Sequence, residues 1–343
     1  MRKILTALSG GVDSAVAAAL LVQQGFEVGA ATMLLHPGGE VEARAAEEAA
    51  ERLGLPFHLF RWEEHFRREV IEPFVEVYRN GGTPNPCVFC NKSLKFGRFL
   101  DEALALGYDG VATGHYARIE TGEGRVLLKT ALDPAKDQTY MLACLDQRQL
   151  SHTVLPLGGY TKPEVRELAA RFGLTRLQGK KDSQDICFIP DGDYLGFLEK
   201  YGSPPVMGHF LGTGGETLAT HQGYEGYTIG QRRGLGYAAG RRLYVVAKPW
   251  PDVVLGEEED LYSARARLSG LNWIPWAEPP GPFRAVVKLR YTAKPAPCTV
   301  TVCPGGAELD FDTPQRAVTP GQAAVLYDGD SVLGAGTILD TVF

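Results

Sequence analysis

The chain has no apolar run near the roughly 20 residues that a membrane-spanning helix needs, so we expect no membrane partner. It also has no excess of positive charge, because 35 Lys and Arg stand against 41 Asp and Glu. The net charge of −6 gives no sign of a nucleic-acid partner, so any surface for RNA has to be local. Met1-Arg2-Lys3 leads straight into an apolar run, which predicts no secretory signal. The six cysteines are therefore expected to be mostly reduced, and the expected location is cytoplasmic.

Two common nucleotide-binding motifs are missing, but another phosphate-binding loop is present. The chain has no GxxxxGK[ST], and its first glycines do not form GxGxxG. Instead, Ser9–Ser14 reads Ser-Gly-Gly-Val-Asp-Ser, between a predicted strand over 4–8 and a predicted helix ended by Gly25. This order aims backbone N–H groups and the positive end of a helix dipole at one point, which favours phosphate. Asp13 is unusual in such a loop and indicates either bound Mg²⁺ or a role in holding the loop.

Strands and helices alternate after this loop. Strands are predicted over 28–34 and 57–60, and helices over 41–53 and 63–79. This alternation predicts an α/β fold with a doubly wound parallel sheet. Met33 lies near the carboxyl end of its strand, where such sheets bind ligands, so it is either a wall of the nucleotide pocket or a core residue.

A cysteine pair follows a loop rich in glycine and proline. Cys87 and Cys90 form CxxC, and Asn91 is predicted to cap a helix over 93–106. A thiol near a helix N-terminus is shifted towards the thiolate. The pair fits a redox pair, a zinc half-site, iron–sulfur ligands or a sulfur-carrying nucleophile. The chain has no second CxxC and no HxxxH, so a closed four-ligand zinc site would lack half of its ligands.

A further cysteine, Cys187, lies in an apolar strand predicted over 186–189. Lys180 and Lys181 precede it and would lower its pKa. Cys187 is distant from Cys90 in sequence, but the fold could bring the two thiols together.

The composition changes beyond Gly202-Ser203-Pro204-Pro205, where helical periodicity gives way to short β-like runs. The last of these have the regular spacing of a small barrel. Arg284, Lys288, Arg290 and Lys294 alternate with apolar residues, which places the cations on one face of a strand. This stripe suits contact with a phosphate backbone, although a solvated edge strand protected by charge is the alternative.

Motifs spread over nearly the whole chain resemble those of the bacterial tRNA-specific 2-thiouridylases. The stretch Ser9–Ser14 matches the SGGxDS signature of the PP-loop ATP pyrophosphatases, which cleave ATP to AMP and pyrophosphate. The other matching blocks, in family order, are Thr83-Pro84-Asn85-Pro86, Cys90-Asn91-Lys92, Lys95-Phe96, Ala112–Tyr116, Lys136-Asp137-Gln138, Lys181-Asp182-Ser183, Ile186–Ile189, Thr228–Arg232 and Thr319–Gln322.

The resemblance implies an α/β protein of three parts. These would be a PP-loop (adenine nucleotide alpha hydrolase-like) adenylation domain over 1–200, a small central tRNA-contacting domain over 201–265, and a β-barrel over 266–343. The implied activity is ATP-dependent 2-thiolation of the wobble uridine of tRNA. In it, AMP is attached to the C2 oxygen and sulfur then replaces that oxygen.

The resemblance also implies roles for particular residues. Cys90 would be the nucleophile, Cys187 its partner, and Asp13 a further catalytic residue. The implied ATP-binding residues are Ala7, Leu8, Ser9, Gly10, Gly11, Val12, Asp13, Ser14, Met33 and Gly114. The implied tRNA-binding residues are Asn85, Pro86 and Cys87 around the target base, together with His115, Lys136, Asp137, Gln138, Arg290, Tyr291 and Gln322.

The chain departs from many family members at Cys87, where they carry Asp. Cys87, Cys90 and Cys187 give three thiolates, which could hold a [4Fe–4S] cluster and leave one iron free for sulfide. The alternative needs no cluster and carries the sulfur as a persulfide on Cys187. The expected cofactors are therefore ATP, Mg²⁺ and this cluster, with a cysteine desulfurase, a sulfur relay protein or sulfide as donor. Rival functions are an amide-forming PP-loop ligase or synthetase, or a non-catalytic RNA-binding iron–sulfur protein.

Overall fold

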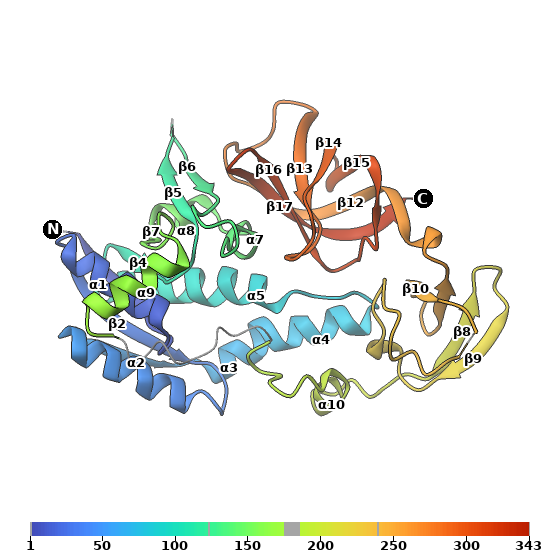
Figure 1. Ribbon diagram of the computed structural model, residues 1–343, viewed down its shortest axis with the longest axis horizontal. Coiled ribbons are helices and arrows are strands. Elements are labelled where there is room, and N and C mark those ends of the chain that lie inside the picture. Colours follow the sequence, from blue (N-terminus) through green and yellow to red (C-terminus); the bar gives the residue numbers. More distant parts are fainter. Residues whose placement is uncertain (1, 123, 175–185, 239, 343) are drawn as a thin grey trace.

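The computed structural model describes residues 2–122, 124–174, 186–238 and 240–342 and contains three structural units (Figure 1). The N-terminal unit is a parallel sheet with helices, the middle unit is a small four-stranded sheet, and the C-terminal unit is a closed barrel. The predicted fold class is therefore confirmed. No helix among the described residues is long and apolar enough to cross a membrane. The predicted domain limits at 200 and 265 stay a prediction. The predicted effect of Lys180 and Lys181 on the pKa of Cys187 also stays a prediction, because both lysines lie outside the described residues.

The N-terminal sheet has the strand order β3-β2-β1-β4-β7, and all its pairs are parallel. Its strands are β1 (Lys3–Ala7), β2 (Glu27–Leu34), β3 (Phe57–Arg61), β4 (Gly110–Ala112) and β7 (Thr153–Val154). Neighbouring residues of a strand point to opposite faces, so Ala30 packs in one buried cluster and Ala31 in another. The first cluster includes residues of α1 (Val12–Gln23), α2 (Glu40–Leu53) and α9 (Lys162–Arg171). The second includes residues of α6 (Phe99–Ala105), which makes the sheet doubly wound.

Two long helices lead from this sheet towards the other units (Figure 1). The first runs without a break through α3 (Glu63–Phe66), η1 (Arg67–Ile71) and α4 (Glu72–Arg79), over the predicted range. The second runs through α5 (Pro86–Phe89), the π-helical segment η2 (Cys90–Arg98) and α6. Short elements complete this unit: α7 (Thr139–Leu142), α8 (Gln147–Ser151), α10 (Tyr194–Lys200), and the hairpin β5 (Arg118–Thr121) and β6 (Val126–Lys129).

The prediction of Asn91 as the cap of the second helix was wrong. Asn85 is the cap, and its side-chain oxygen accepts a hydrogen bond from Cys87 N at 3.2 Å. Pro86 fits the first helical position because its ring fixes φ and its missing N–H is not needed there. The cysteine pair therefore lies inside the first turns of a helix, and Asn91 is buried in it. The strand predicted over 186–189 was also wrong, because this segment forms turns.

The middle and C-terminal units are β-structures. The middle sheet has the order β10-β11-β8-β9, and the barrel has the order β12-β15-β14-β13-β16-β17, closed by pairing of β12 with β17. The middle strands are β8 (Gly208–Gly212), β9 (Thr217–His221), β10 (Tyr244–Ala247) and β11 (Val253–Gly256). The barrel strands are β12 (Tyr262–Trp273), β13 (Phe283–Lys288), β14 (Ala296–Cys303), β15 (Gly306–Arg316), β16 (Ala323–Asp328) and β17 (Ser331–Val342). Two short 3₁₀ turns, η4 (Tyr224–Gly226) and η5 (Glu259–Leu261), complete these units. The predicted alternation is confirmed within β13, since Ala285 and Val287 are buried in the barrel core. It was wrong beyond Lys288, because the strand ends there and Arg290 and Lys294 do not lie on it.

Candidate active site

The glycine loop lies between β1 and α1 and is held by its own side chains. Ser9 N donates to Ser14 Oγ at 3.1 Å, and that hydroxyl donates to Gly11 O at 3.1 Å. Gly10 has a φ of 68°, and a Cβ added there would lie 2.7 Å from Ala45 Cβ. Both the conformation and the close approach require glycine at this position. The loop therefore presents its backbone at the N-terminus of α1, as anion binding needs.

Gly114 and Met33 lie beside this loop at the carboxyl ends of neighbouring strands. A Cβ on Gly114 would lie 2.7 Å from Ser14 N, so the loop after β4 touches the start of α1. On β2, Ala31 pairs with Ala7, and Met33 lies beyond that pair, half-buried. The predicted ATP-binding residues are thus gathered at one edge of the sheet, where open α/β sheets bind ligands.

Sequence reasoning missed Lys162, which pairs with Asp13. Lys162 Nζ donates to both carboxylate oxygens of Asp13, at 2.9 and 2.8 Å, and the Tyr116 hydroxyl donates to Oδ1 at 3.0 Å. Lys162 is only 6% exposed. A signal was available, because Lys162 is the first residue of α9, where the helix dipole disfavours a cation. The ion pair with Asp13 explains why a lysine is found at this position. Lys162 therefore lies beside the glycine loop, where phosphate would bind.

The three candidate thiols lie in one region, because Ile186 and Phe188, on either side of Cys187, pack in the buried cluster that contains Cys90. Cys87 precedes Cys90 by one helical turn. Cys90 is buried among apolar residues that include Ile189, and this burial is the main reason that its pKa rises to about 11. Desolvation also raises the pKa of Cys187, although part of that residue is exposed to solvent. The predicted shift towards thiolate was therefore wrong in this conformation, since desolvation outweighs the helix terminus.

The predicted metal ligands do not form a metal site in this structure. Among the described residues, no three His, Cys, Asp or Glu side chains are placed to hold a metal ion. Cys87 and Cys187 are exposed, whereas Cys90 is buried. The donor set fits an iron–sulfur cluster in chemistry, but its present arrangement does not.

Lys95 is a second residue that sequence reasoning left without a role. It lies on η2 after Cys90, and its positive charge lowers the pKa of Cys90, Cys187 and His115. His115 is held by a hydrogen bond of 2.7 Å between its Nδ1 and Thr113 Oγ1. Burial, with the charge of Lys95, lowers the pKa of His115 to about 3. His115 is therefore neutral at physiological pH and could contact tRNA only as a neutral group.

Several predicted tRNA-binding residues are engaged in holding the protein together. The backbones of Gln138 and Tyr116 are linked by a hydrogen bond of 2.9 Å, and the Gln138 side chain accepts from Tyr116 N at 2.9 Å. The Asp137 carboxylate accepts from Ala131 N at 2.9 Å and from the Thr139 hydroxyl at 2.6 Å. Since Tyr116 also binds Asp13, the segment Lys136–Gln138 is tied to the glycine loop through one tyrosine.

The predicted tRNA-binding residues of the barrel contact the other two units. Arg290 donates to Ile229 O at 3.1 Å, and the Tyr291 hydroxyl donates to Asp137 O at 3.3 Å. Gln322 Nε2 donates to Thr83 O at 2.7 Å.

The basic stripe is also partly neutralised. Arg284 forms an ion pair with Asp312 of β15, an acid from elsewhere in the barrel that the alternation within one strand did not reveal. Lys288 Nζ lies 5.9 Å from the centre of the Tyr291 ring.

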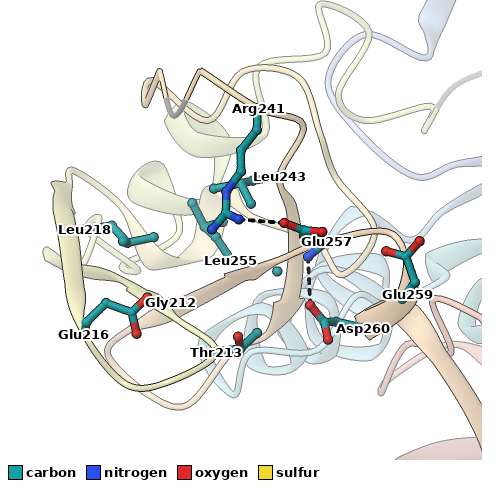
Figure 2. A pocket seen from close by; sticks show the side chains of 11 residues that line it. Gly212, Thr213, Glu216, Leu218, Arg241, Leu243, Leu255, Glu257, Glu259 and Asp260 are labelled. Atoms are coloured by element: carbon teal, nitrogen blue, oxygen red, sulfur yellow. Dashed lines mark hydrogen bonds and ion pairs between the residues drawn. The ribbon is translucent and has the colours of Figure 1, made fainter.

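A separate cavity of about 350 Å³ lies in the middle unit (Figure 2). Glu216, Glu257 and Asp260 line it, and Arg241 points to Glu257, with which it forms an ion pair of 2.6 Å. None of the predicted site residues lines this cavity. Its acidic lining is unsuited to a phosphate backbone.

Comparison with known proteins agrees with this geometry. Residues 2–191 match the tRNA methyl transferase HUP domain, 196–252 the tRNA methyl transferase PRC-barrel domain, and 263–338 the aminomethyltransferase beta-barrel domain. The chain is 47% identical over 348 residues to the tRNA-specific 2-thiouridylase MnmA of Syntrophotalea carbinolica, covering 98% of each chain. The chain belongs to the tRNA-specific 2-thiouridylase family.

Other relatives agree with this membership. The tRNA-specific 2-thiouridylase MnmA of Carboxydothermus hydrogenoformans is 45% identical, covering 98% of this chain and 97% of its own length. A solved structure of the U34-tRNA thiolase NcsA from Methanococcus maripaludis with its [4Fe-4S] cluster is 19% identical. It has a TM-score of 0.35, covers 58% of this chain and 63% of its own, and is too dissimilar to carry an argument. Membership confirms the prediction of an enzyme that uses ATP to thiolate tRNA uridine.

Proposed function

We propose that this thiouridylase family member thiolates C2 of the wobble uridine of tRNA, and that Cys90 is an essential thiol of the sulfur-transfer step. The observation that carries the proposal is that Ile186 and Phe188, the neighbours of Cys187, pack in the buried cluster that contains Cys90. Cys187 therefore lies close to the helix that carries Cys87 and Cys90, although it is distant from both in the sequence. A PP-loop ligase or synthetase that forms amides would need no such set of thiols. The proximity therefore favours sulfur transfer over that rival.

The first step activates the uridine. A carbonyl oxygen is a poor leaving group and has to be activated before sulfur can replace it. The uridine O2 therefore attacks the α-phosphorus of ATP, which releases pyrophosphate and attaches AMP to O2. The loop around Gly10 and Gly11 would bind the phosphates, with Mg²⁺ offsetting their charge. Lys162, held at the loop by Asp13, is placed to stabilise charge that develops on a phosphate oxygen. Asp13 holds both Lys162 and the Tyr116 hydroxyl at the loop, so Asp13→Ala should abolish adenylation.

The second step replaces oxygen by sulfur. A sulfur nucleophile attacks C2, the C2–O bond breaks, and AMP leaves with the former uridine oxygen. The buried Cys90 thiol is protonated near neutral pH, since burial raises its pKa to about 11. The positive charge of Lys95 favours the Cys90 thiolate. For Cys90 to react as a thiolate, binding of tRNA would have to strengthen this interaction.

A [4Fe–4S] cluster is our proposed sulfur-holding group. Cys87, Cys90 and Cys187 would hold it, and when bound it would offer one iron without a protein ligand to sulfide. The alternative carries the sulfur as a persulfide on Cys187, and Cys90 then closes a disulfide as the sulfur is released to C2. Anaerobic purification with iron and sulfide assays distinguishes them, because Cys87→Asp should lose iron only under the cluster proposal.

The decisive test of the function separates the two steps. Cys90→Ser should still form AMP from ATP in the presence of tRNA, because the glycine loop is intact, but should make no 2-thiouridine. Wild-type protein and Cys303→Ser, a substitution in the barrel away from the site, are the controls. Formation of 2-thiouridine by Cys90→Ser would contradict the proposal, as would a normal wobble nucleoside in cells that lack this chain.

The remaining partners follow from this chemistry. We propose that the tRNA anticodon loop enters near Asn85, Pro86 and Cys87, with Lys136 and Tyr291 at its backbone. A cysteine desulfurase, a sulfur relay protein or sulfide would supply the sulfur. The reaction would take place in the cytoplasm, where tRNA is modified.

A further inference from the structure

The barrel is bound to the loop that leads into the helix carrying Cys87 and Cys90. We call residues 319–322 the barrel corner and residues 81–84 the entry loop. Thr83 N donates to Pro320 O at 2.9 Å. Gln322 Nε2 donates back to Thr83 O at 2.7 Å and lies 3.5 Å from Pro84 O. The entry loop is therefore held by hydrogen bonds in both directions.

The two segments are also in close steric contact. Gly321 has a φ of 89°, and a Cβ added there would lie 3.0 Å from Thr83 N and 2.7 Å from Val77 Cγ1. A Cβ on Gly82 would lie 3.2 Å from Pro320 O. Both glycines are needed for this approach, so the contact is part of the packing of the fold.

The barrel corner is itself fixed by Arg290. The guanidinium donates to the Thr319 hydroxyl and to Ala317 O at 2.9 Å, and it also donates to Ile229 O of the middle unit. Thr319 is only 2% exposed. The corner therefore presents Pro320 and Gln322 to the entry loop from a rigid base that also contacts the middle unit.

The entry loop leads directly into the cap of the cysteine-bearing helix. Pro84 is followed at once by Asn85, which caps that helix by accepting a hydrogen bond from Cys87 N. Asn85 Nδ2 also lies 3.6 Å from Met141 Sδ. A shift of Thr83 or Pro84 would move the cap, and with it the first turn that carries Cys87 and Cys90.

We propose that Gln322 is a positioning residue, through which the barrel holds the entry loop and so places Cys90 for sulfur transfer. This role is exerted through hydrogen bonds within the chain. It differs from the direct tRNA contact that family resemblance implies for Gln322. The catalytic part of the inference rests on the proposed function, whereas the holding of the entry loop does not.

Hydrogen exchange of the full chain without tRNA tests the holding of the loop. Gln322→Ala removes one hydrogen bond, so exchange at the Thr83 amide should become about fivefold faster. Gln315→Ala is the matched control, because Gln315 lies in the same barrel and its side chain donates to Thr313 rather than to the entry loop. Unchanged exchange at Thr83 in Gln322→Ala would overturn the proposal.

Steady-state kinetics then test the catalytic consequence. In Gln322→Ala, kcat for 2-thiouridine formation should fall about fivefold, with KM for tRNA and AMP formation unchanged. A rise in KM alone would overturn the proposal and assign Gln322 to tRNA contact. Gln322→Glu keeps the size of the side chain but cannot donate to Thr83 O, so it must reproduce both results if the alanine variant folds poorly. If the wild type made no 2-thiouridine, the proposed function would fail while the exchange result still decided the holding role.

Discussion

Replacing Lys162 by methionine should loosen the contact of α9 with α1. The variant keeps an apolar stem but leaves the Asp13 carboxylate without the two hydrogen bonds that Lys162 donates at 2.9 and 2.8 Å. Removing one partner of a fully buried ion pair costs about 3–5 kcal/mol. The Asp13 side chain is 28% exposed, so water can solvate the carboxylate and offset part of this loss. We therefore expect the variant to lose about 2 kcal/mol of stabilising free energy at this contact. That free energy corresponds to about 30-fold more frequent opening.

Hydrogen exchange followed by mass spectrometry measures this opening locally, without assuming that three structural units unfold together. Peptides from α1 and α9 should exchange faster in Lys162→Met, while barrel peptides should not change. Lys200→Met, at an exposed lysine of α10, is the control. Asp13→Asn combined with Lys162→Met removes both charges and should cost less than the two single effects added together. Unchanged exchange in α9, or strict additivity in the double variant, would refute the inference that this pair holds the site.

Two further predictions concern the same site. Gly114→Ala should cost about 1–3 kcal/mol and weaken ATP binding measured by calorimetry, because its Cβ would lie 2.7 Å from Ser14 N. Gly159→Ala, which has open space, should change neither quantity, and equal effects of the two would contradict the steric argument. The rate of Cys90 alkylation without tRNA should rise about tenfold per pH unit from pH 7 towards the Cys90 pKa of about 11, because only the thiolate reacts. A rate that levels off below pH 9 would contradict the conclusion that burial raises this pKa. Because the fold favours the neutral thiol, the stability contribution of Cys90 should fall as the pH rises through the window between 9 and 11.

The glycine loop could be predicted from sequence because its information is local. Ser9–Ser14 lies between a buried strand and a helix, and the structure has the same order. The parallel sheet could be predicted for the same reason, since each strand and helix shows its own period. The helix that carries Cys90 begins earlier than its sequence predicts, because prolines usually indicate a loop, whereas Pro86 occupies the first position of the helix.

Residues that act across long sequence separations could not be predicted in this way. Lys162 was not predicted as a site residue, although its position against the helix dipole was a usable signal. Arg290, Tyr291 and Gln322 were predicted to bind tRNA, and that role stays a prediction. The structure adds that all three also bond to other units of the chain.

The sequence alone determined the glycine loop, the α/β class and the CxxC pair as candidate thiols, because each depends on neighbouring residues whose backbone and side-chain chemistry act together. Only the tertiary structure decided that Asp13 meets Lys162, that burial keeps Cys90 protonated, and that the barrel holds Thr83. Those facts depend on which distant segments exclude water from one another. No local pattern encodes that exclusion, because desolvation is a property of the packed chain.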